Sequence, residues 1–294
     1  MLYDIRLDID YEYDMTATVG RHLVHLMPAN LPGRQRLISG YLTIEPMPAE
    51  RRERIDYFGN SVVEATLLAP HQSARFSVQA RVERYDDAPG LDVSAPPGLL
   101  ADQIAAIRSM DSRSPHHFLY SSPRVSINHE MTAYARGACA DAATTFGAVS
   151  ALNSALNRDM EFDPEATTVE TSPEDAFKRR RGVCQDFTHI MIACLRGMGI
   201  PAGYVSGYLR TIPPPGAEKL EGADAMHAWV RAWCGQEMGW IDFDPTNNLI
   251  VSADHIVVGW GRDYGDVAPV RGITRTAGEQ QSRQSVDVDP VERL

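Results

Sequence analysis

Cys184, His227 and the aspartates at positions 242 and 244 are the residues whose types and order could support nucleophilic catalysis. In such a site a cysteine attacks a carbonyl carbon and a histidine accepts the thiol proton. A carboxylate orients the imidazole and stabilises its charged form. A lone cysteine on an apolar helix face more commonly serves packing. The catalytic interpretation therefore depends on elements that bring these side chains together.

Cys184 begins a segment that has the periodicity of a buried helix. The apolar positions of this segment recur every three or four residues, at Phe187, Ile190, Met191, Cys194, Leu195 and Met198. Gly197, Gly199 and Pro201 supply a C-terminal stop. At the N-terminal end, unpaired N–H groups and the helix dipole favour a thiolate over a thiol. We therefore predict Cys184 in the first turn of a helix, as a candidate nucleophile.

His227 and both aspartates lie in a predicted β-hairpin, in which segments 227–233 and 240–244 flank a turn at 235–239. Reflection of His227 across the centre of this hairpin lands close to Asp244, with Asp242 two residues away on the same face. Strand parity alone therefore leaves both carboxylates open as the partner of His227. If this sheet packs over the N-terminus of the Cys184 helix, thiol, imidazole and carboxylate can line up.

The N-terminal part of the chain predicts an antiparallel β-sandwich. Residues 3–14 alternate apolar and polar side chains, and similar short runs follow at 22–27, 37–44, 62–68 and 76–85. A stretch rich in Pro and Gly then marks a boundary. We predict an α+β protein with four parts: a β-sandwich at 1–88, a connecting segment at 89–130, a helix-and-sheet core at 131–275, and a polar, loosely held C-terminal tail at 276–294.

Composition restricts the partners and the compartment. The formal net charge of -11 over 294 residues argues against a nucleic-acid groove and against an anionic membrane surface. The N-terminus alternates polar and apolar residues, and no run of about 18 apolar residues occurs, so neither a signal peptide nor a membrane helix is predicted. The four cysteines lack C-x-x-C spacing and predict free thiols. We expect a cytoplasmic protein, with its oligomeric state left open.

No metal or cofactor site is predicted. His116 and His117 lie in a loop-like stretch without matching ligands. The motif Asn128-His-Glu130 is not H-E-x-x-H, because Ala133 holds the place of the second histidine. The segment Asp287-Val-Asp-Pro lacks the glycine and the bidentate glutamate of a calcium loop.

Several motifs together resemble the bacterial transglutaminase-like cysteine-protease family. They are Arg181-Gly-Val-Cys-Gln-Asp-Phe-Thr-His-Ile-Met-Ile, Gly203-Tyr-Val-Ser-Gly-Tyr-Leu, His227-Ala-Trp-Val, Gly239-Trp-Ile-Asp-Phe-Asp-Pro-Thr-Asn, Gly261-Arg-Asp-Tyr264 and Asp266-Val-Ala-Pro269. The N-terminal strands with Phe58-Gly-Asn60 resemble the β-rich domain that precedes the core in many bacterial members. The resemblance implies a papain-like core with Cys184 as nucleophile, His227 as base and Asp244 as the orienting carboxylate.

One position departs from animal transglutaminases, which have Trp directly after the nucleophile and use another, upstream Trp to stabilise the oxyanion. This chain has Gln185 after Cys184, and all four of its Trp residues lie after position 228. We expect the oxyanion donors to come from elsewhere, such as the Cys184 backbone N–H and one side chain. The expected activity is hydrolysis of an amide or peptide bond in a peptide or protein substrate. The alternatives are transfer to an amine and a non-catalytic binding scaffold.

Overall fold

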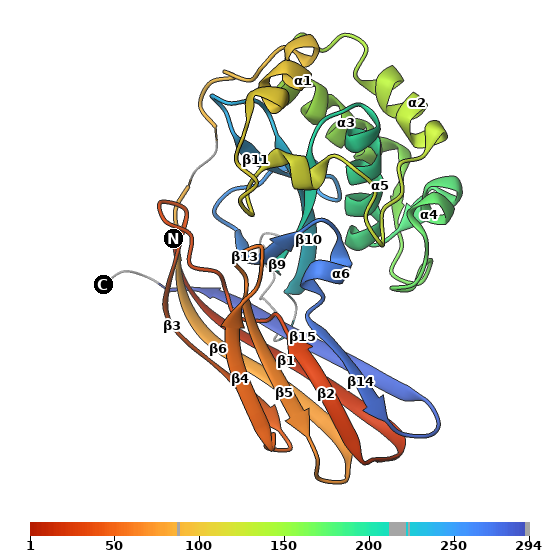
Figure 1. Cartoon of the computed structure of the whole chain (residues 1–294). Coiled ribbons are helices and arrows are strands. Elements are labelled where there is room, and N and C mark those ends of the chain that lie inside the picture. The colour runs from red at the N-terminus through yellow and green to blue at the C-terminus, as the bar shows by residue number, and fades with distance from the viewer. Residues whose placement is uncertain (87–88, 212–221, 223, 292–294) are drawn as a thin grey trace, which may run out of the picture.

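The structure, a computed structural model, describes residues 1–86, 89–211, 222 and 224–291. Figure 1 shows long strands in the lower part of the molecule, and helices beside a second group of strands in the upper part. This arrangement confirms the predicted α+β class, in which an antiparallel β-sandwich precedes a core of helices packed on an antiparallel sheet.

The described part of the sandwich consists of two four-stranded antiparallel sheets with the orders β15-β1-β6-β3 and β14-β2-β5-β4. The period of two in β1 places Tyr3, Ile5 and Leu7 between the sheets and the intervening Asp and Arg side chains outside. The strands are β1 (Leu2–Ala17), β2 (Val19–Val24), β3 (Gln35–Glu45), β4 (Glu50–Ile55), β5 (Ser61–Leu67), β6 (His71–Arg84), β14 (Val270–Arg275) and β15 (Gln280–Pro290).

The C-terminal segment returns to the sandwich. We had expected the core to end at 275 and to be followed by a loosely held tail at 276–294. Strand β15 pairs with β1 along its length, from Tyr3 opposite Pro290 to Tyr13 opposite Gln280, and β14 pairs with β2. Val286 and Val288 enter the sandwich core. The sequence of this segment is too polar to predict a strand. The strand forms because its backbone pairs with the edge of β1. Residues 292–294 of the expected tail lie outside the described residues.

The core contains an antiparallel sheet of order β12-β11-β10-β9-β13 with helices on one face. Helix α5 packs on β9 and β10 and is surrounded by α2, α3 and α4. The elements are α1 (Pro97–Ala106), the 3-10 helix η1 (Pro115–Phe118), α2 (His129–Ala138), α3 (Thr145–Asp159), β7 (Glu161–Phe162), α4 (Pro173–Arg179), β8 (Arg181–Gly182), α5 (Cys184–Gly197), β9 (Ala202–Leu209), β10 (Ala225–Trp233), β11 (Trp240–Asp244), β12 (Leu249–Ile250), β13 (His255–Gly261) and α6 (Tyr264–Val267).

Two polar side chains of the sandwich fix β13 of the core. The Gln35 amide nitrogen donates to the Val257 carbonyl at 2.7 Å, and its oxygen accepts from the Val257 N–H at 2.8 Å. Asn60, the last residue of the motif at 58–60, makes the same reciprocal pair with Trp260. A buried amide that satisfies both backbone groups of a strand residue sets the register between the two parts.

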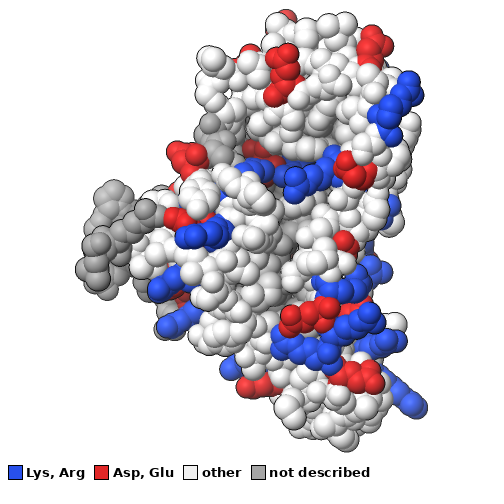
Figure 2. Space-filling view, turned by 60° about the vertical axis from the view of Figure 1, so that its left-hand side comes forward, with Lys and Arg blue, Asp and Glu red and all other residues white. Residues whose placement is uncertain are grey.

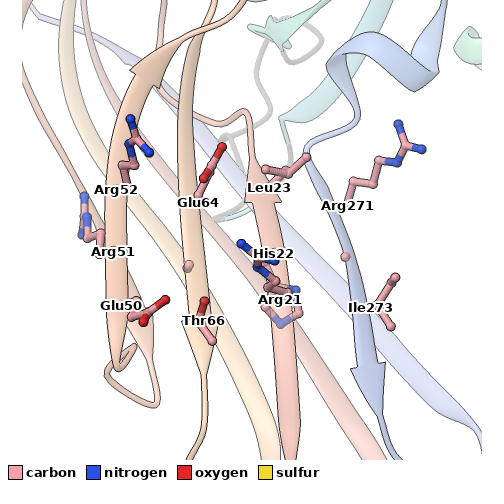
Figure 3. Close-up of a pocket in the computed structure, with 12 residues that line it drawn as sticks. Arg21, His22, Leu23, Glu50, Arg51, Arg52, Glu64, Thr66, Arg271 and Ile273 are labelled. Carbon is pink, nitrogen blue, oxygen red and sulfur yellow. The ribbon is translucent and has the colours of Figure 1, made fainter.

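The sandwich surface is charged and hollowed. Figure 2 shows basic and acidic side chains interleaved over the lower part of the molecule. A hollow of about 700 Å³ lies on the outer face of the sheet β14-β2-β5-β4, with Arg21, Glu64 and Ile273 among its lining residues (Figure 3). None of the predicted catalytic residues lines this hollow. Across the described ranges, no helix combines the length and apolar character needed to span a membrane.

Candidate active site

Cys184 is the first residue of α5, as the periodicity predicted. The turn before it is fixed by Asp186, whose carboxylate accepts from the Val183 N–H at 2.8 Å and from the Thr167 hydroxyl at 2.6 Å. A Cβ at Gly182 would lie 2.5 Å from an oxygen of Asp186, so a larger residue there would displace this carboxylate. Gly182 of the Arg-Gly-Val-Cys motif therefore leaves room for the carboxylate that fixes the turn before Cys184. The Cys184 side chain is partly exposed.

His227 lies in β10 opposite Gly207 of β9. A Cβ at Gly207 would lie 2.4 Å from the Trp229 ring, which explains the glycine in the predicted Val-Ser-Gly-Tyr strand. The His227 Nε2 atom is 2.8 Å from Asp244 Oδ2, and Cys184 is the second group that raises the pKa of His227. Because Asp244 occupies Nε2, the other ring nitrogen, Nδ1, is available to the thiol. The structure thus brings the three predicted side chains together.

Asp244 is fully buried and accepts hydrogen bonds from five donors of the described residues. Its Oδ1 accepts from the backbone N–H groups of Thr246 and Asn247, at 3.0 and 3.1 Å. Its Oδ2 accepts from His227, from His255 at 3.0 Å and from the Asn247 amide at 2.7 Å. Burial favours the neutral acid, but these hydrogen bonds hold the pKa of Asp244 well below its ordinary value. The carboxylate is therefore ionised at neutral pH.

The charge on His227 follows from its two partners. Burial disfavours the imidazolium, yet the hydrogen bond to Asp244 and the interactions with Cys184 and with the charges of both groups raise the pKa of His227 to about 10. The imidazole is thus protonated at neutral pH, between a carboxylate and a sulfur atom. This is the charge state in which a thiolate–imidazolium pair forms.

The sequence did not single out His255, the first residue of β13. Its side chain is 2% exposed, its ring meets the Trp229 ring edge-on at 5.1 Å, and its Nε2 binds Asp244. One signal in the sequence could have found it. A histidine that opens an otherwise apolar strand, here followed by Ile256 and Val257, needs a polar partner when the strand is buried.

The two aspartates that strand parity could not separate have different partners. Asp242 pairs with Arg231, directly opposite in β10, at 3.3 Å, and with Arg34 of the sandwich at 3.2 Å. Burial favours protonation of Asp242, but the charges of Arg231 and Arg34 hold its pKa below the ordinary value. The structure places Asp244, and not Asp242, against His227.

The ligand atoms of His227, Asp244 and His255 lie within 4.8 Å of one another, a set that could hold a metal ion. The Asn247 amide nitrogen lies 2.7 Å from Asp244 Oδ2 and 3.4 Å from His227 Nε2, so an N–H donor contacts two of the three groups. Hydrogen bonds therefore account for the arrangement. The predicted absence of a metal stays a prediction.

The other three cysteines have environments unsuited to nucleophilic attack. Burial raises the pKa of the Cys139 thiol to about 11 and that of the Cys234 thiol to about 12, and it raises the pKa of Cys194 further. All four cysteines lie in the described part of the chain, and none forms a disulfide. Of the four, Cys184 combines partial exposure with an interaction that raises the pKa of a histidine.

Comparisons with known proteins agree with this architecture. A family model described as the transglutaminase-like superfamily matches residues 132–245, and one described as the bacterial transglutaminase-like N-terminal region matches residues 3–83. Uncharacterized proteins of Mycobacterium tuberculosis and Mycobacterium bovis are each 35% identical over 99% of this chain and 93% of their own. One of Mycobacterium leprae is 34% identical over 96% of this chain and 94% of its own.

A crystal structure of a candidate cysteine protease from Cytophaga hutchinsonii has the same fold. It aligns with a TM-score of 0.77 and 22% identity, over 100% of this chain and 92% of that protein. The two family matches lie on the sandwich and on the core that carries Cys184 and His227. The chain therefore belongs to the transglutaminase-like superfamily, with the fold of a cysteine-dependent enzyme and the N-terminal region of its bacterial members.

Proposed function

We propose that this protein is a cysteine-dependent acyl-transfer enzyme that hydrolyses an amide or peptide bond through Cys184, His227 and Asp244. The observation that carries the proposal is the buried imidazole of His227, bound by Asp244 at 2.8 Å, with the partly exposed Cys184 as the other group that raises its pKa. A structural core histidine does not require an ionised, fully buried carboxylate and a partly exposed thiol as its two partners.

In the proposed reaction the Cys184 sulfur attacks the carbonyl carbon, a C–S bond forms, and the π electrons move to the carbonyl oxygen. The C–N bond then breaks as His227 transfers its proton to the leaving amine, which produces a thioester. Water attacks the thioester after His227 takes its proton, and the C–S bond breaks. Asp244 remains ionised throughout and keeps the imidazole oriented.

Water is the proposed acceptor, and an amine is the alternative that would make the protein a transamidase. The absence of a Trp upstream of Cys184 supports hydrolysis, because that Trp belongs to the oxyanion site of the cross-linking animal enzymes. We further propose that the substrate is a peptide or protein and that the enzyme acts in the cytoplasm. Four free thiols suit a reducing compartment.

The test is incubation with a mixed peptide library, with and without a primary amine donor, read by mass spectrometry. Cleavage, deamidation and amine incorporation leave different masses, so one measurement separates peptidase, amidase and transamidase. The matched control is Cys184→Ala, which removes only the sulfur atom. We expect cleavage or deamidation by the natural protein and none by the variant. Equal product from both would reject the enzyme and favour the binding scaffold.

A further inference from the structure

The outer face of the sheet β14-β2-β5-β4 carries more cations than anions. Its outward-facing charged side chains are Arg21 of β2, Glu50, Arg52 and Arg54 of β4, Glu64 of β5, and Arg271 and Arg275 of β14. The whole chain, by contrast, has a formal net charge of -11. A local excess of arginine on an acidic protein attracts an anionic partner to that face.

Most of this positive charge is not neutralised within the chain. Arg54 binds Glu64 at 2.6 Å, so this glutamate is already paired. Across the described ranges, Arg21 and Arg52 are exposed and make neither a hydrogen bond nor an ion pair. Arg271 donates to a backbone carbonyl at 3.1 Å and contacts no carboxylate of the described residues. Three guanidinium groups on one face are therefore free to bind carboxylates from outside.

The arginines on the outer face of the other sheet are arranged differently. Arg81 binds Asp4 through two hydrogen bonds, each of 2.6 Å. Arg75 binds Asp10 in the same way, at 2.5 and 3.1 Å. Protection of a sheet edge can account for the arginines on β4, which is an edge strand. It does not account for Arg21, because β2 lies between β14 and β5.

The strand register arranges the outward side chains in two rows across the hollow of about 700 Å³ (Figure 3). One row is Arg271, Leu23, Glu64 and Arg52, and the next is Ile273, Arg21, Thr66 and Glu50. Neighbouring strands are about 4.8 Å apart, so the two arginines that end the first row lie about 14 Å apart at their backbones. The cations thus border an elongated surface.

Apolar side chains lie among these cations. Ile273 is 83% exposed on β14, and Leu23 of the neighbouring strand β2 is partly exposed. An extended polypeptide matches this combination, because its side chains at positions i, i+2 and i+4 point the same way and span about 14 Å. A flat membrane surface does not enter a hollow, and a phosphate backbone offers no apolar group to Ile273.

We propose that the outer face of the sheet β14-β2-β5-β4 binds an extended acidic segment of a partner protein. Two carboxylates four residues apart contact Arg271 and Arg52, and an apolar side chain between them packs on Ile273 and Leu23. Arg21 adds a third cation beside the first row. None of the predicted catalytic residues lines this hollow, so the inference goes beyond the proposed hydrolysis and does not depend on it.

The experiment titrates the full chain into a fluorescein-labelled, end-capped peptide Glu-Ser-Leu-Ser-Glu and follows the fluorescence anisotropy. The double variant Arg21→Gln/Arg52→Gln is compared with the matched control Arg75→Gln/Arg81→Gln, which removes the same charge from the other sheet. We expect Kd to rise about tenfold for the first variant and to stay unchanged for the control. Added salt should weaken binding by the natural protein. All four arginines are exposed, so Tm should remain close to the natural value.

Two further peptides test the chemistry of the bound segment. Gln-Ser-Leu-Ser-Gln lacks the carboxylates and should not bind. Glu-Ser-Ser-Ser-Glu lacks the apolar side chain and should bind more weakly than the parent peptide. Equal binding of either peptide would overturn the corresponding part of the proposal. Displacement of the parent peptide by a lower concentration of an oligonucleotide, or of vesicles that contain phosphatidylserine, would assign the face to that class of partner instead.

The remaining outcomes separate this face from the rest of the molecule. Equal Kd values for the natural protein and Arg21→Gln/Arg52→Gln would reject the site. An equal rise in both double variants would reject it too, because the attraction would then follow the total charge. Cys184→Ala should bind the peptide as tightly as the natural protein. Failure of the proposed hydrolysis would therefore leave this inference intact, and loss of the peptide site would leave the hydrolysis intact.

Discussion

Asp242 and Asp244 lie two residues apart on the same face of β11, yet Asp242 pairs with arginines and Asp244 pairs with a histidine. Asp242 contacts Arg231 at 3.3 Å and Arg34 at 3.2 Å, whereas Asp244 contacts His227 at 2.8 Å. A guanidinium stays charged over the whole pH range of a folded protein, while an imidazole can gain and lose a proton. The same side chain, in nearly the same place, therefore serves two purposes.

The partners decide which purpose each carboxylate serves. Asp242 holds a permanent charge, and because Arg34 belongs to the sandwich, this cluster also joins the two parts of the molecule. The Arg231 guanidinium lies over the Trp260 ring at 4.6 Å, which fixes it further. Asp244 holds a group that can exchange a proton with the thiol. A buried carboxylate alone is thus no sign of catalysis, and its partner's chemistry is the more informative feature.

Asp244→Asn is expected to have the largest effect of any change in this comparison. Asn has the same shape but no charge to stabilise the imidazolium, and its amide favours the wrong tautomer of His227. We expect turnover of the best-cleaved library peptide to fall about 10⁴-fold. The matched control Asp242→Asn should retain most of its turnover per folded molecule. An equal loss in both variants would contradict the division between the two carboxylates.

The same two variants should rank in the opposite order in their loss of stability, with the larger loss for Asp242→Asn. Asp242→Asn leaves the Arg231 guanidinium buried without an anion, and removal of one partner from a buried ion pair costs about 3–5 kcal/mol. Asp244→Asn leaves two imidazoles that can become neutral, so its loss should be smaller. Urea unfolding at neutral pH measures both free energies. A larger loss for Asp244→Asn would show that the histidine cluster is the stronger structural contact.

The two pairs should also differ in how stability depends on pH. Burial opposes the charge on His227, yet its contacts with Asp244 and Cys184 raise its pKa to about 10. A raised folded-state pKa contributes fully below the unfolded value of about 6.5, and the contribution is lost as pH rises through the folded pKa. The free energy of unfolding should therefore fall between neutral pH and about pH 10 by at least about 1 kcal/mol.

Unfolding of the variants in urea at the two pH values separates His227 from other groups that titrate near pH 10. Asp242→Asn should keep this fall, because its arginine partners do not titrate there. Asp244→Asn should lose much of it, because the anion that holds the proton on His227 is gone. Equal falls in all three proteins would assign the pH dependence to other residues.

The sequence predicted those features that depend on local pattern. Alternation along β1 and the 3-and-4 spacing along α5 each specify an element by themselves, and Gly197 and Gly199 mark the C-terminal end of α5. The choice between Asp242 and Asp244 required more than pattern. Both aspartates face the same side of β11. Arg34 of the sandwich, which binds Asp242, lies 208 residues away from it in the chain.

Two further features escaped prediction because distant segments create them. Strand β15 is ordered by pairing with β1, and its own composition is polar. His255 belongs to β13, which lies beside β9, whereas Asp244 belongs to β11, and β10 and β9 separate these two strands in the sheet. The contact between His255 and Asp244 therefore depends on how the whole sheet is assembled. In each case the sequence carries the residue, and the tertiary arrangement supplies the partner that gives it a role.

Substitution of His255 should have the smallest and most selective effect of these changes. His255 is a second histidine that contacts Asp244, the carboxylate that binds His227. His255→Phe removes one of the donors to Asp244 Oδ2, which frees the carboxylate to rotate. We expect turnover to fall about tenfold, since small misplacements of a catalytic group cost up to about 10²-fold. KM should not change, because His255 is 2% exposed and out of reach of substrate.

The conservative variant His255→Gln separates positioning from packing. Its amide can still donate to Asp244, so it should recover most of the turnover that His255→Phe loses. Equal losses in both variants would mean that His255 acts through its edge-on contact with Trp229. Full activity in both would mean that the donors from Asn247 and from the backbone already hold Asp244 in place. Recovery by Gln alone would make the second imidazole a positioning residue of the proposed active site.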